Sequence, residues 1–274
     1  MEKLIFTADD IDEGTEIRIS EYLKTKCGFS HALITKVKFG GVFINGENVH
    51  MRATVKKGDT VVVNLPHEKS DIPPIDIPLN IIYEDDDMIA VDKPSNMPTH
   101  PSRGNSLPTL ANALSAYFGE GFIFRSINRL DRDTSGIVLV AKNSYSAIKL
   151  YKKMRERGFV KKYVALVSGI PKEEHGVIDA PIEREAEGSI KRTVRLDGKP
   201  AVTEYKIIKK LPSGNSLCEI TLHTGRTHQI RVHMAYIGHP LVDDFLYGEK
   251  MGEEYYLRCV RLGDITTDFP PYST

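Results

Sequence analysis

A proline-rich segment divides this chain. Four prolines fall between residues 66 and 79, in the sequence PHEKSDIPPIDIPL. Proline has no backbone N–H and disfavours helical geometry in the residue before it, so the segment can form neither a helix nor an inner strand. We therefore predict an extended linker over residues 66–79, with one folded unit before it (1–65) and a larger one after it (80–274).

Composition fits an ordinary globular protein. Of the 274 residues, 41% are hydrophobic and 27% are charged, and the formal net charge is zero, which is weakly unfavourable for a nucleic-acid binder. No apolar run is long enough to cross a bilayer, and the apolar stretch at the N-terminus is too short for a signal peptide, so a cytoplasmic protein is expected. Three widely spaced cysteines predict neither a disulfide framework nor a zinc site.

The first unit is predicted to contain two short helices and a hairpin. Ser30 is a suitable N-cap for the second helix, and Asn45-Gly46 is a typical tight-turn pair between strands. The predicted elements are helices over 17–26 and 32–39 and strands over 42–44 and 60–64.

The second unit mixes strands and helices without a regular strand–helix–strand repeat, which indicates an α+β fold. Strands are predicted over 88–91, 137–141, 163–167, 201–208 and 217–222. Helices are predicted over 109–118 and 144–157, and a third helix, capped by Thr227, is predicted to end at Ile237.

Three polar motifs stand out in the second unit. They are RLDRDTSG at 129–136, KKYVALV at 161–167 and TGRTHQIRVH at 224–233. Taken singly, each has a structural explanation. Asp131 and Asp133 could bond turn amides, Tyr163 could be a strand aromatic, and the Arg and His residues of the third motif could form a polar helix face.

Together, and in this order, the motifs resemble those of the RluA-type pseudouridine synthases. The resemblance extends over nearly all of residues 80–250 and includes DKP at 92–94, HP at 100–101, GKPA at 198–201 and GHP at 238–240. Residues 16–64, with GGVFINGENV followed by VKKGDTVVV, resemble an S4 RNA-binding domain. The resemblance implies a small S4-type domain followed by a catalytic domain with a mixed, largely antiparallel sheet.

The resemblance also implies roles for individual residues. Asp131, not Asp133, falls on the family's catalytic aspartate, Arg231 on the arginine that pairs with it, and Tyr163 on the tyrosine that stacks on the target base. Arg129 falls on a basic residue that helps hold the RNA open. Pseudouridine formation is an isomerisation, so no cofactor is expected. The further predicted RNA-binding residues are Arg226, Lys36, Lys38, Lys152 and Lys153.

The predicted helix at 144–157 lies in a strongly basic segment. Residues 142–163 contain eight Lys or Arg residues and one acidic residue, Glu156. On charge alone this would be a solvated helix face. For an RNA-modifying enzyme it suits a phosphate backbone, and Lys152 and Lys153 are the residues predicted to contact it.

Two other functions compete with the isomerase. A hydrolase could use Asp131 and Asp133 as acid and base, although carboxylates two residues apart on an extended segment point to opposite sides. A non-catalytic RNA-binding protein could keep the fold without turnover. The expected partner is large-subunit ribosomal RNA, with transfer RNA as the alternative, and the expected state is a monomer. Two departures from the family pattern are Asn128 before the RLD motif and YLRC at 256–259.

Overall fold

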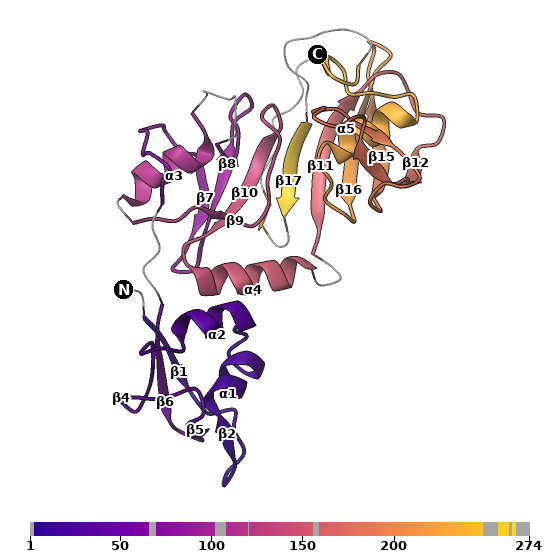
Figure 1. Ribbon diagram of the computed structural model, residues 1–274. Coiled ribbons are helices and arrows are strands. Elements are labelled where there is room, and N and C mark those ends of the chain that lie inside the picture. Colours follow the sequence, from indigo (N-terminus) through magenta and orange to yellow (C-terminus); the bar gives the residue numbers. More distant parts are fainter. Residues whose placement is uncertain are drawn as a thin grey trace.

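The computed structural model describes residues 3–65, 70–101, 108–119, 121–155, 159–248, 257–262 and 265–266. They form an N-terminal unit (residues 3–65) and a larger unit built on one long sheet. The two units meet at helix α4 (Ser144–Arg155), which lies between the N-terminal unit and the sheet (Figure 1). Within the described residues, no helix has the length and apolar character needed to cross a membrane.

The N-terminal unit contains a four-stranded antiparallel sheet in the order β1-β6-β3-β4 and a separate β2–β5 pair. Its elements are β1 (Lys3–Thr7), β2 (Glu16–Arg18), α1 (Ile19–Thr25), α2 (His31–Val37), β3 (Val42–Ile44), β4 (Glu47–Asn48), β5 (Thr54–Lys56) and β6 (Thr60–Asn64). The predicted helices and strands are confirmed, with shorter helices than expected.

Local signals explain this unit. The Ser30 hydroxyl accepts a hydrogen bond from Leu33 N at 3.2 Å, which satisfies one of the free amides at the start of α2. Asn45 and Gly46 have φ values of 50° and 88°, the left-handed conformation that a two-residue hairpin turn requires. The hydrophobic core of this unit also includes Tyr145 of α4, whose ring lies 5.5 Å from that of Phe6 and 5.1 Å from that of Phe29.

The large sheet has the strand order β12-β15-β16-β11-β17-β10-β8-β7, with β18 beside β17 and β9 beside β10. All its strand pairs are antiparallel except β10–β17, so the mixed, largely antiparallel sheet is confirmed. The remaining elements are β7 (Ile81–Glu84), β8 (Met88–Lys93), α3 (Leu110–Phe118), β9 (Arg125–Ser126), β10 (Ser135–Ala141), β11 (Lys161–Val167), β12 (His175–Asp179), β13 (Ile182–Arg184), β14 (Arg192–Val194), β15 (Val202–Lys210), β16 (Ser216–Leu222), α5 (Gln229–Tyr236), β17 (Leu257–Leu262) and β18 (Ile265–Thr266).

Strand β17 is the element that joins the two halves of the sheet. It lies between β10 and β11, although it is far from both in the sequence (Figure 1). Gly136 of β10 has φ of 109°, and a Cβ at this position would lie 2.3 Å from the carbonyl oxygen of Cys259. Only glycine allows β10 and β17 to approach this closely. The atypical YLRC segment thus contributes a central strand from Leu257 onward; Tyr256 lies outside the described residues.

The described part of the predicted linker, residues 70–79, contains no helix or strand, as expected. It is nevertheless hydrogen-bonded to the larger unit. Ile75 N donates to Asn112 O at 3.2 Å, and Asn112 Nδ2 donates to Pro73 O at 2.8 Å. Residues 66–69 lie outside the described residues. Residues 70–79 therefore lie against α3 as an extended segment.

The start of helix α5 differs from the prediction. Thr227 is not its N-cap: the helix begins at Gln229, and His228 is the N-cap residue, with φ of 58° and ψ of 17° and without a side-chain capping bond. A threonine N-cap would form a side-chain capping bond, but it would not give the chain the left-handed turn found at His228. The left-handed conformation of His228 directs its ring into a pocket beside the large sheet.

Candidate active site

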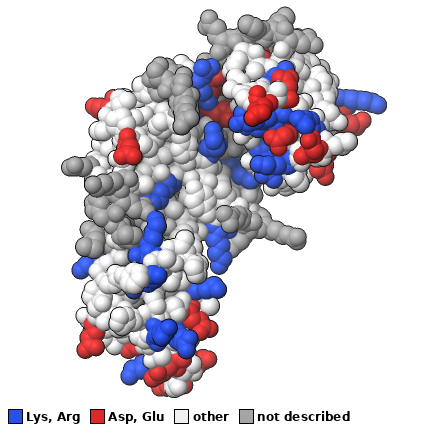
Figure 2. All heavy atoms as spheres, in the orientation of Figure 1, with Lys and Arg blue, Asp and Glu red and all other residues white. Residues whose placement is uncertain are grey.

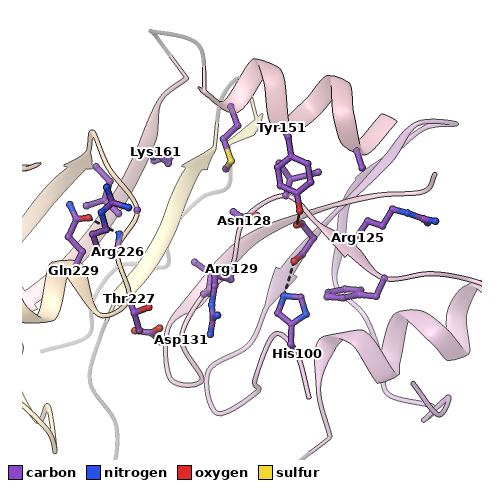
Figure 3. A pocket seen from close by; sticks show the side chains of 18 of the residues that line it. His100, Arg125, Asn128, Arg129, Asp131, Tyr151, Lys161, Arg226, Thr227 and Gln229 are labelled. Atoms are coloured by element: carbon purple, nitrogen blue, oxygen red, sulfur yellow. Dashed lines mark hydrogen bonds between the residues drawn. The ribbon is translucent and has the colours of Figure 1, made fainter. Parts of the chain in front are cut away.

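A pocket of about 750 Å³ opens between the large sheet, the start of α5, helix α4 and helix α2. It has two ends, as Figure 3 shows. The Asp131 end is lined by Asp131, Arg226, His228 and Arg231. The α2–α4 end is lined by Leu33, Lys36, Ile148 and Tyr151, together with His100, Phe124 and Arg125. A single nucleotide would fill only part of such a volume.

Asp131 lies in the loop before β10, and its side chain is 21% exposed. This loop is anchored by Lys93, which is completely buried at the end of β8. The Lys93 ammonium donates to Pro94 O, Met97 O and Arg132 O at 2.8, 2.7 and 3.0 Å, although burial lowers its pKa to about 8. Thr99 Oγ1 also donates to Leu130 O at 2.8 Å. The backbone on both sides of Asp131 is therefore fixed.

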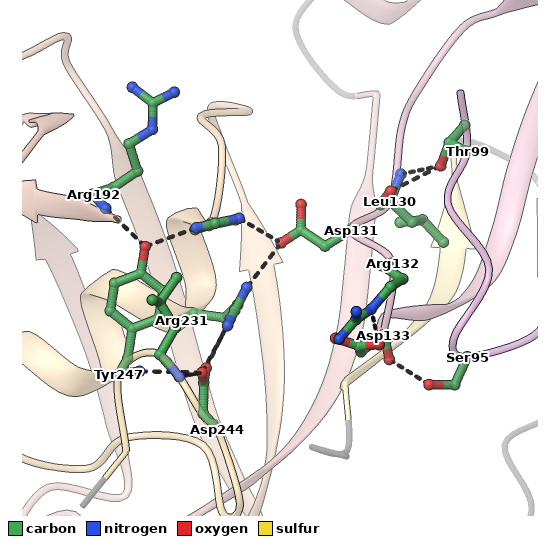
Figure 4. A network of polar contacts seen from close by, with 12 residues as sticks. Ser95, Thr99, Leu130, Asp131, Arg132, Asp133, Arg192, Arg231, Asp244 and Tyr247 are labelled. Atoms are coloured by element: carbon green, nitrogen blue, oxygen red, sulfur yellow. Dashed lines mark hydrogen bonds and ion pairs between the residues drawn. The ribbon is translucent and has the colours of Figure 1, made fainter. Parts of the chain in front are cut away.

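Arg231 comes from α5 and is 3% exposed. Its Nε and Nη2 both donate to the carboxylate of Asp244 at 2.7 Å, and Nη1 lies 3.8 Å from Asp131 Oδ2 (Figure 4). The predicted proximity of Arg231 and Asp131 is observed, but the strongest partner of Arg231 is Asp244, which is fully buried. Asp244 also accepts hydrogen bonds from Leu246 N and Tyr247 N. It therefore orients the guanidinium toward Asp131.

His228 is a site residue to which the sequence motifs gave no catalytic role. Its Nε2 lies 3.9 Å from Asp131 Oδ2, and its Nδ1 lies 2.7 Å from the Tyr247 hydroxyl. Tyr247 in turn lies against Arg231, with 4.9 Å between the guanidinium carbon and the ring centroid, and its hydroxyl accepts a hydrogen bond from Arg192 N at 2.9 Å. The left-handed backbone of His228, which no local sequence signal indicates, brings this ring into the site.

Tyr163 of β11 lines the same pocket and is 7% exposed. Burial raises the pKa of its hydroxyl well above the ordinary tyrosine value, and the neighbouring Cys259 thiol and Asp131 carboxylate act in the same direction. The ring therefore stays neutral. It is a flat apolar surface at the wall of the pocket, on the other side of β17 from the Asp131 loop.

Asp133 has a different environment from Asp131. It is 6% exposed, does not line the pocket, and accepts two hydrogen bonds from Arg132, from Nε at 2.7 Å and from Nη2 at 2.9 Å. The two carboxylates therefore do not face a common substrate. This arrangement contradicts the two-carboxylate hydrolase that the sequence left open. Asn128 is also structural, since its side chain bridges Ile137 O and Leu139 N at 2.9 Å each.

The two predicted RNA-binding arginines lie at the rim of the pocket. Arg129 and Arg226 are both exposed and line it. Arg226 Nε donates to Pro200 O at 2.9 Å. The loop that carries Arg226 is fixed by the buried Gln229, whose Oε1 accepts from Arg226 N and from the Thr224 hydroxyl. This loop presents positive charge at the entrance without blocking it.

The predicted lysines are spread over the two units. Lys36 lines the pocket, whereas Lys38, Lys152 and Lys153 are exposed outside it. Lys38 Nζ lies 4.6 Å from the ring of Phe39, which is 84% exposed. Figure 2 shows Lys and Arg side chains across the middle of this face, between the N-terminal unit and the large sheet, with acidic side chains mainly toward the lower end and the upper right.

Two members of the basic segment are already paired. Lys142 lies 2.7 Å from Glu84 and Lys162 lies 2.7 Å from Glu219. Neither belongs to α4. The charge available to a ligand is therefore smaller than the sequence count suggests.

The α2–α4 end combines apolar and aromatic side chains with two basic ones, Lys36 and Arg125. Tyr151 is 40% exposed, and its hydroxyl donates to Ser126 O at 2.7 Å, which fixes the ring (Figure 3). His100 Nε2 lies 2.9 Å from Ser126 Oγ, and the His100 ring packs edge-on against Phe124 with 5.0 Å between centroids. Within the described ranges, no group of three or more His, Cys, Asp or Glu side chains is placed to hold a metal ion.

Comparison with known proteins agrees with this architecture. The sequence model of RNA pseudouridylate synthase matches residues 87–236, which include Asp131, Tyr163 and Arg231. The chain belongs to the RNA pseudouridylate synthase family. It is therefore an isomerase that acts on RNA, and the non-catalytic alternative is set aside.

The relatives extend over most of the chain. An RNA pseudouridine synthase of Aquifex aeolicus is 40% identical over 249 residues, which are 87% of this chain and 79% of that protein. Ribosomal large subunit pseudouridine synthase D of Xanthomonas campestris is 38% identical over 233 residues, 80% of this chain and 67% of that protein. Among solved structures, human RNA pseudouridylate synthase domain containing 1 superposes with a TM-score of 0.59 at 28% identity, covering 74% of this chain and 86% of that one.

Proposed function

We propose that this enzyme converts specific uridines of large-subunit ribosomal RNA to pseudouridine, with Asp131 as the catalytic carboxylate. The observation that carries the proposal is the position of Asp131. It is a partly exposed carboxylate in a pocket that could hold a nucleotide, 3.8 Å from a buried arginine. A buried charge of opposite sign is what such a carboxylate needs in order to stay ionised inside a pocket.

The reaction breaks the bond between C1′ of the ribose and N1 of uracil, turns the base, and joins C1′ to C5. The C5 hydrogen leaves as a proton and N1 gains one, so the reaction needs neither an oxidant nor a cofactor. An ionised carboxylate could attack covalently, or it could stabilise a cationic sugar and remove a proton. Asp131 is suited to both, and the geometry of the free site favours neither.

Arg231 would hold the Asp131 carboxylate in position through their ion-pair contact. Two of its nitrogens are occupied by Asp244, so its orientation is fixed before RNA binds, and the third is directed at Asp131. Such preorganisation removes the need to reorient a charge during the reaction. In this proposal Asp244 is a positioning residue, since it acts through Arg231.

The target base must leave the RNA stack to reach Asp131. Tyr163 would give it a surface to stack on, a contribution of about 1–3 kcal/mol. Arg129, exposed at the rim, would hold the opened RNA, and Arg226 would contact the backbone at the other side of the entrance. All four residues line one pocket, which supports their acting on one nucleotide.

The N-terminal unit would be an S4 RNA-binding domain, with boundaries 1–65, a linker over 66–79 and the catalytic domain over 80–274. Lys36 lies in the pocket wall and Lys38 beside an exposed Phe39, so the RNA would run from Asp131 past Tyr151 to α2. Lys152 and Lys153 would contact phosphates along α4. The continuity of the pocket with α2 supports this path.

Ribosomal RNA is proposed because two of the similar proteins, from Xanthomonas campestris and Haemophilus ducreyi, are ribosomal large subunit pseudouridine synthases. Transfer RNA is the alternative substrate. The experiment that decides is a chemical map of pseudouridine in total RNA from three strains: one with the intact gene, one with a deletion, and one with Asp131→Asn.

We expect one or a few ribosomal sites to vanish in both the deletion and the Asp131→Asn strain, since removal of a catalytic carboxylate slows such reactions by about 10⁴-fold. If sites vanish only from transfer RNA, the substrate is transfer RNA and the proposed role of Asp131 is retained. Sites that vanish in the deletion and persist with Asp131→Asn would refute the role of Asp131.

A further inference from the structure

We infer that His228 is a positioning residue that holds Asp131 together with Arg231 and so selects which carboxylate oxygen faces the uridine. The inference rests on the proposed role of Asp131. His228 Nε2 and Arg231 Nη1 lie 3.9 and 3.8 Å from the same atom, Asp131 Oδ2. Because both nitrogens lie near one oxygen, the second oxygen, Oδ1, is left for the substrate.

The distances describe the enzyme without RNA. Contacts in free active sites are often long and shorten when the substrate binds. The His228 side chain is 15% exposed and that of Arg231 3% exposed, so an incoming nucleotide would remove the remaining water from the Asp131 carboxylate, which is 21% exposed. Both contacts then become stronger, because less water competes for the same oxygen.

Tyr247 decides which nitrogen of His228 carries the proton. Its hydroxyl accepts a hydrogen bond from Arg192 N at 2.9 Å and lies 2.7 Å from His228 Nδ1 (Figure 4). A tyrosine hydroxyl has one proton to donate. When that proton goes to Nδ1, the neutral ring must carry its own proton on Nε2. The chain of donors then runs from Arg192 N through Tyr247 and His228 to Asp131.

The backbone of His228 is part of this arrangement. With φ of 58° it is in the left-handed region, which residues other than glycine seldom adopt. Such conformations persist where the surrounding structure requires them, and they cluster at functional sites. Here the conformation places the ring between Tyr247 and Asp131, at the point where α5 begins.

The surroundings of the ring keep it neutral, chiefly through burial. Burial, the largest effect, lowers the pKa of His228, and Arg231 of α5 and Arg192 of β14 act in the same direction. Asp131, from the loop before β10, and Asp244, from the segment after α5, oppose them, but the pKa remains below the ordinary histidine value. The ring is thus a neutral donor at neutral pH. As pH falls through this lowered pKa, Nδ1 gains a proton and can no longer accept from Tyr247.

The test uses His228→Asn, since asparagine tolerates the left-handed backbone but has no atom at the Nε2 position. Turnover is measured as tritium released from [5-³H]uridine-labelled ribosomal RNA of a strain lacking the gene. We expect kcat to fall about 100-fold, the size of effect that misplacement of a reacting group by 1 Å produces, while KM changes by less than about twofold.

Two further variants make the result interpretable. Tyr247→Phe keeps the ring and removes only the hydroxyl, and should give a smaller loss of kcat. His175→Asn, an exposed histidine of β12 outside the pocket, should match the unmodified enzyme. Thermal melting of each variant shows whether it is folded.

Each outcome bears on one claim. A folded His228→Asn enzyme with unchanged kcat, or with a changed KM alone, would overturn the role of His228 while leaving Asp131 in place. An Asp131→Asn enzyme that still releases tritium in the same assay would instead overturn the proposed function itself. Loss of turnover in both, with an intact KM in His228→Asn, supports the inference.

Discussion

The two ends of the pocket are built on different principles. At the Asp131 end, Arg231 and Asp244 are buried charges with fixed hydrogen bonds, and His228 and Tyr247 are tied to each other. At the α2–α4 end, the wall combines apolar and aromatic side chains with Lys36 and Arg125 and comes from two different units; its Tyr151 is 40% exposed. One end has several polar groups directed at a single carboxylate, and the other presents a broad surface.

We interpret this difference as a separation between the end of the pocket where the reaction takes place and the end that binds RNA. A reacting carboxylate must be held within a fraction of an ångström, so its neighbours are buried and mutually bonded. A surface on which bases stack needs only flat rings and nearby positive charge, because every base has a flat face. We therefore expect changes at the Asp131 end to alter kcat and stability, and changes at the α2–α4 end to alter RNA affinity.

The largest effect is expected from Asp244→Asn. The substitution keeps the shape of the side chain but leaves the buried Arg231 without its counter-charge, and breaking a buried pair in this way costs about 3–5 kcal/mol of stability. The free energy of unfolding, measured with urea, should fall by this amount, and kcat should fall with it because Arg231 is no longer oriented toward Asp131.

Asp243→Asn is the matched control for this change. Asp243 is the preceding residue, it is exposed, and its φ of 61° is one that asparagine adopts readily. Its stability and kcat should stay close to those of the unmodified enzyme. Equal behaviour of the two variants would show that the Asp131 end does not depend on the buried pair.

An intermediate effect is expected from Tyr151→Ala at the α2–α4 end. Removal of a stacking ring weakens RNA binding by about 1–3 kcal/mol, or roughly 5- to 150-fold in Kd. Tyr151→Phe keeps the ring and loses only the hydrogen bond to Ser126 O, so it should retain most of the affinity. Titration of labelled ribosomal RNA measures both. A fall in kcat without a change in Kd would remove the distinction between the two ends.

The smallest effect is expected from the double variant Lys152→Glu and Lys153→Glu. If these lysines contact phosphates, the slope of log affinity against log salt should become shallower by about 0.7–0.9 for each phosphate that is no longer neutralised. Lys206→Glu with Lys209→Glu makes the same charge change on exposed positions of β15 outside the pocket. The α4 role is refuted if affinity and salt slope remain those of the unmodified enzyme, or if both pairs behave alike.

Local structure was predictable from short signals. Ser30 caps α2 as predicted, and Asn45-Gly46 forms the predicted turn. The helix predicted over 109–118 begins one residue later, with Thr109 as its N-cap. These features depend on neighbours within a few residues, so the sequence specifies them directly. The three motifs likewise led to one pocket, because Asp131, Tyr163 and Arg231 all line it.

The features that the sequence did not predict depend on contacts between segments that lie far apart in the chain. Nothing near Leu257–Leu262 indicates that this strand lies between β10 and β11. Asp244 is thirteen residues from Arg231, and its bidentate contact depends on the turn after α5. Thr227 satisfied the local rule for a helix cap, yet the N-cap residue is His228. Its left-handed backbone places its ring between Tyr247 and Asp131.

The central position of β17 has a consequence for biosynthesis. A ribosome delivers the chain from the N-terminus, and domains form as their segments emerge. The edges of β10 and β11 that later receive β17 have no partner strand until residue 257 and its successors are made. Open strand edges invite pairing with other chains. Until β17 is made, the segments that carry Asp131 and Tyr163 therefore belong to two sheets that no strand yet joins.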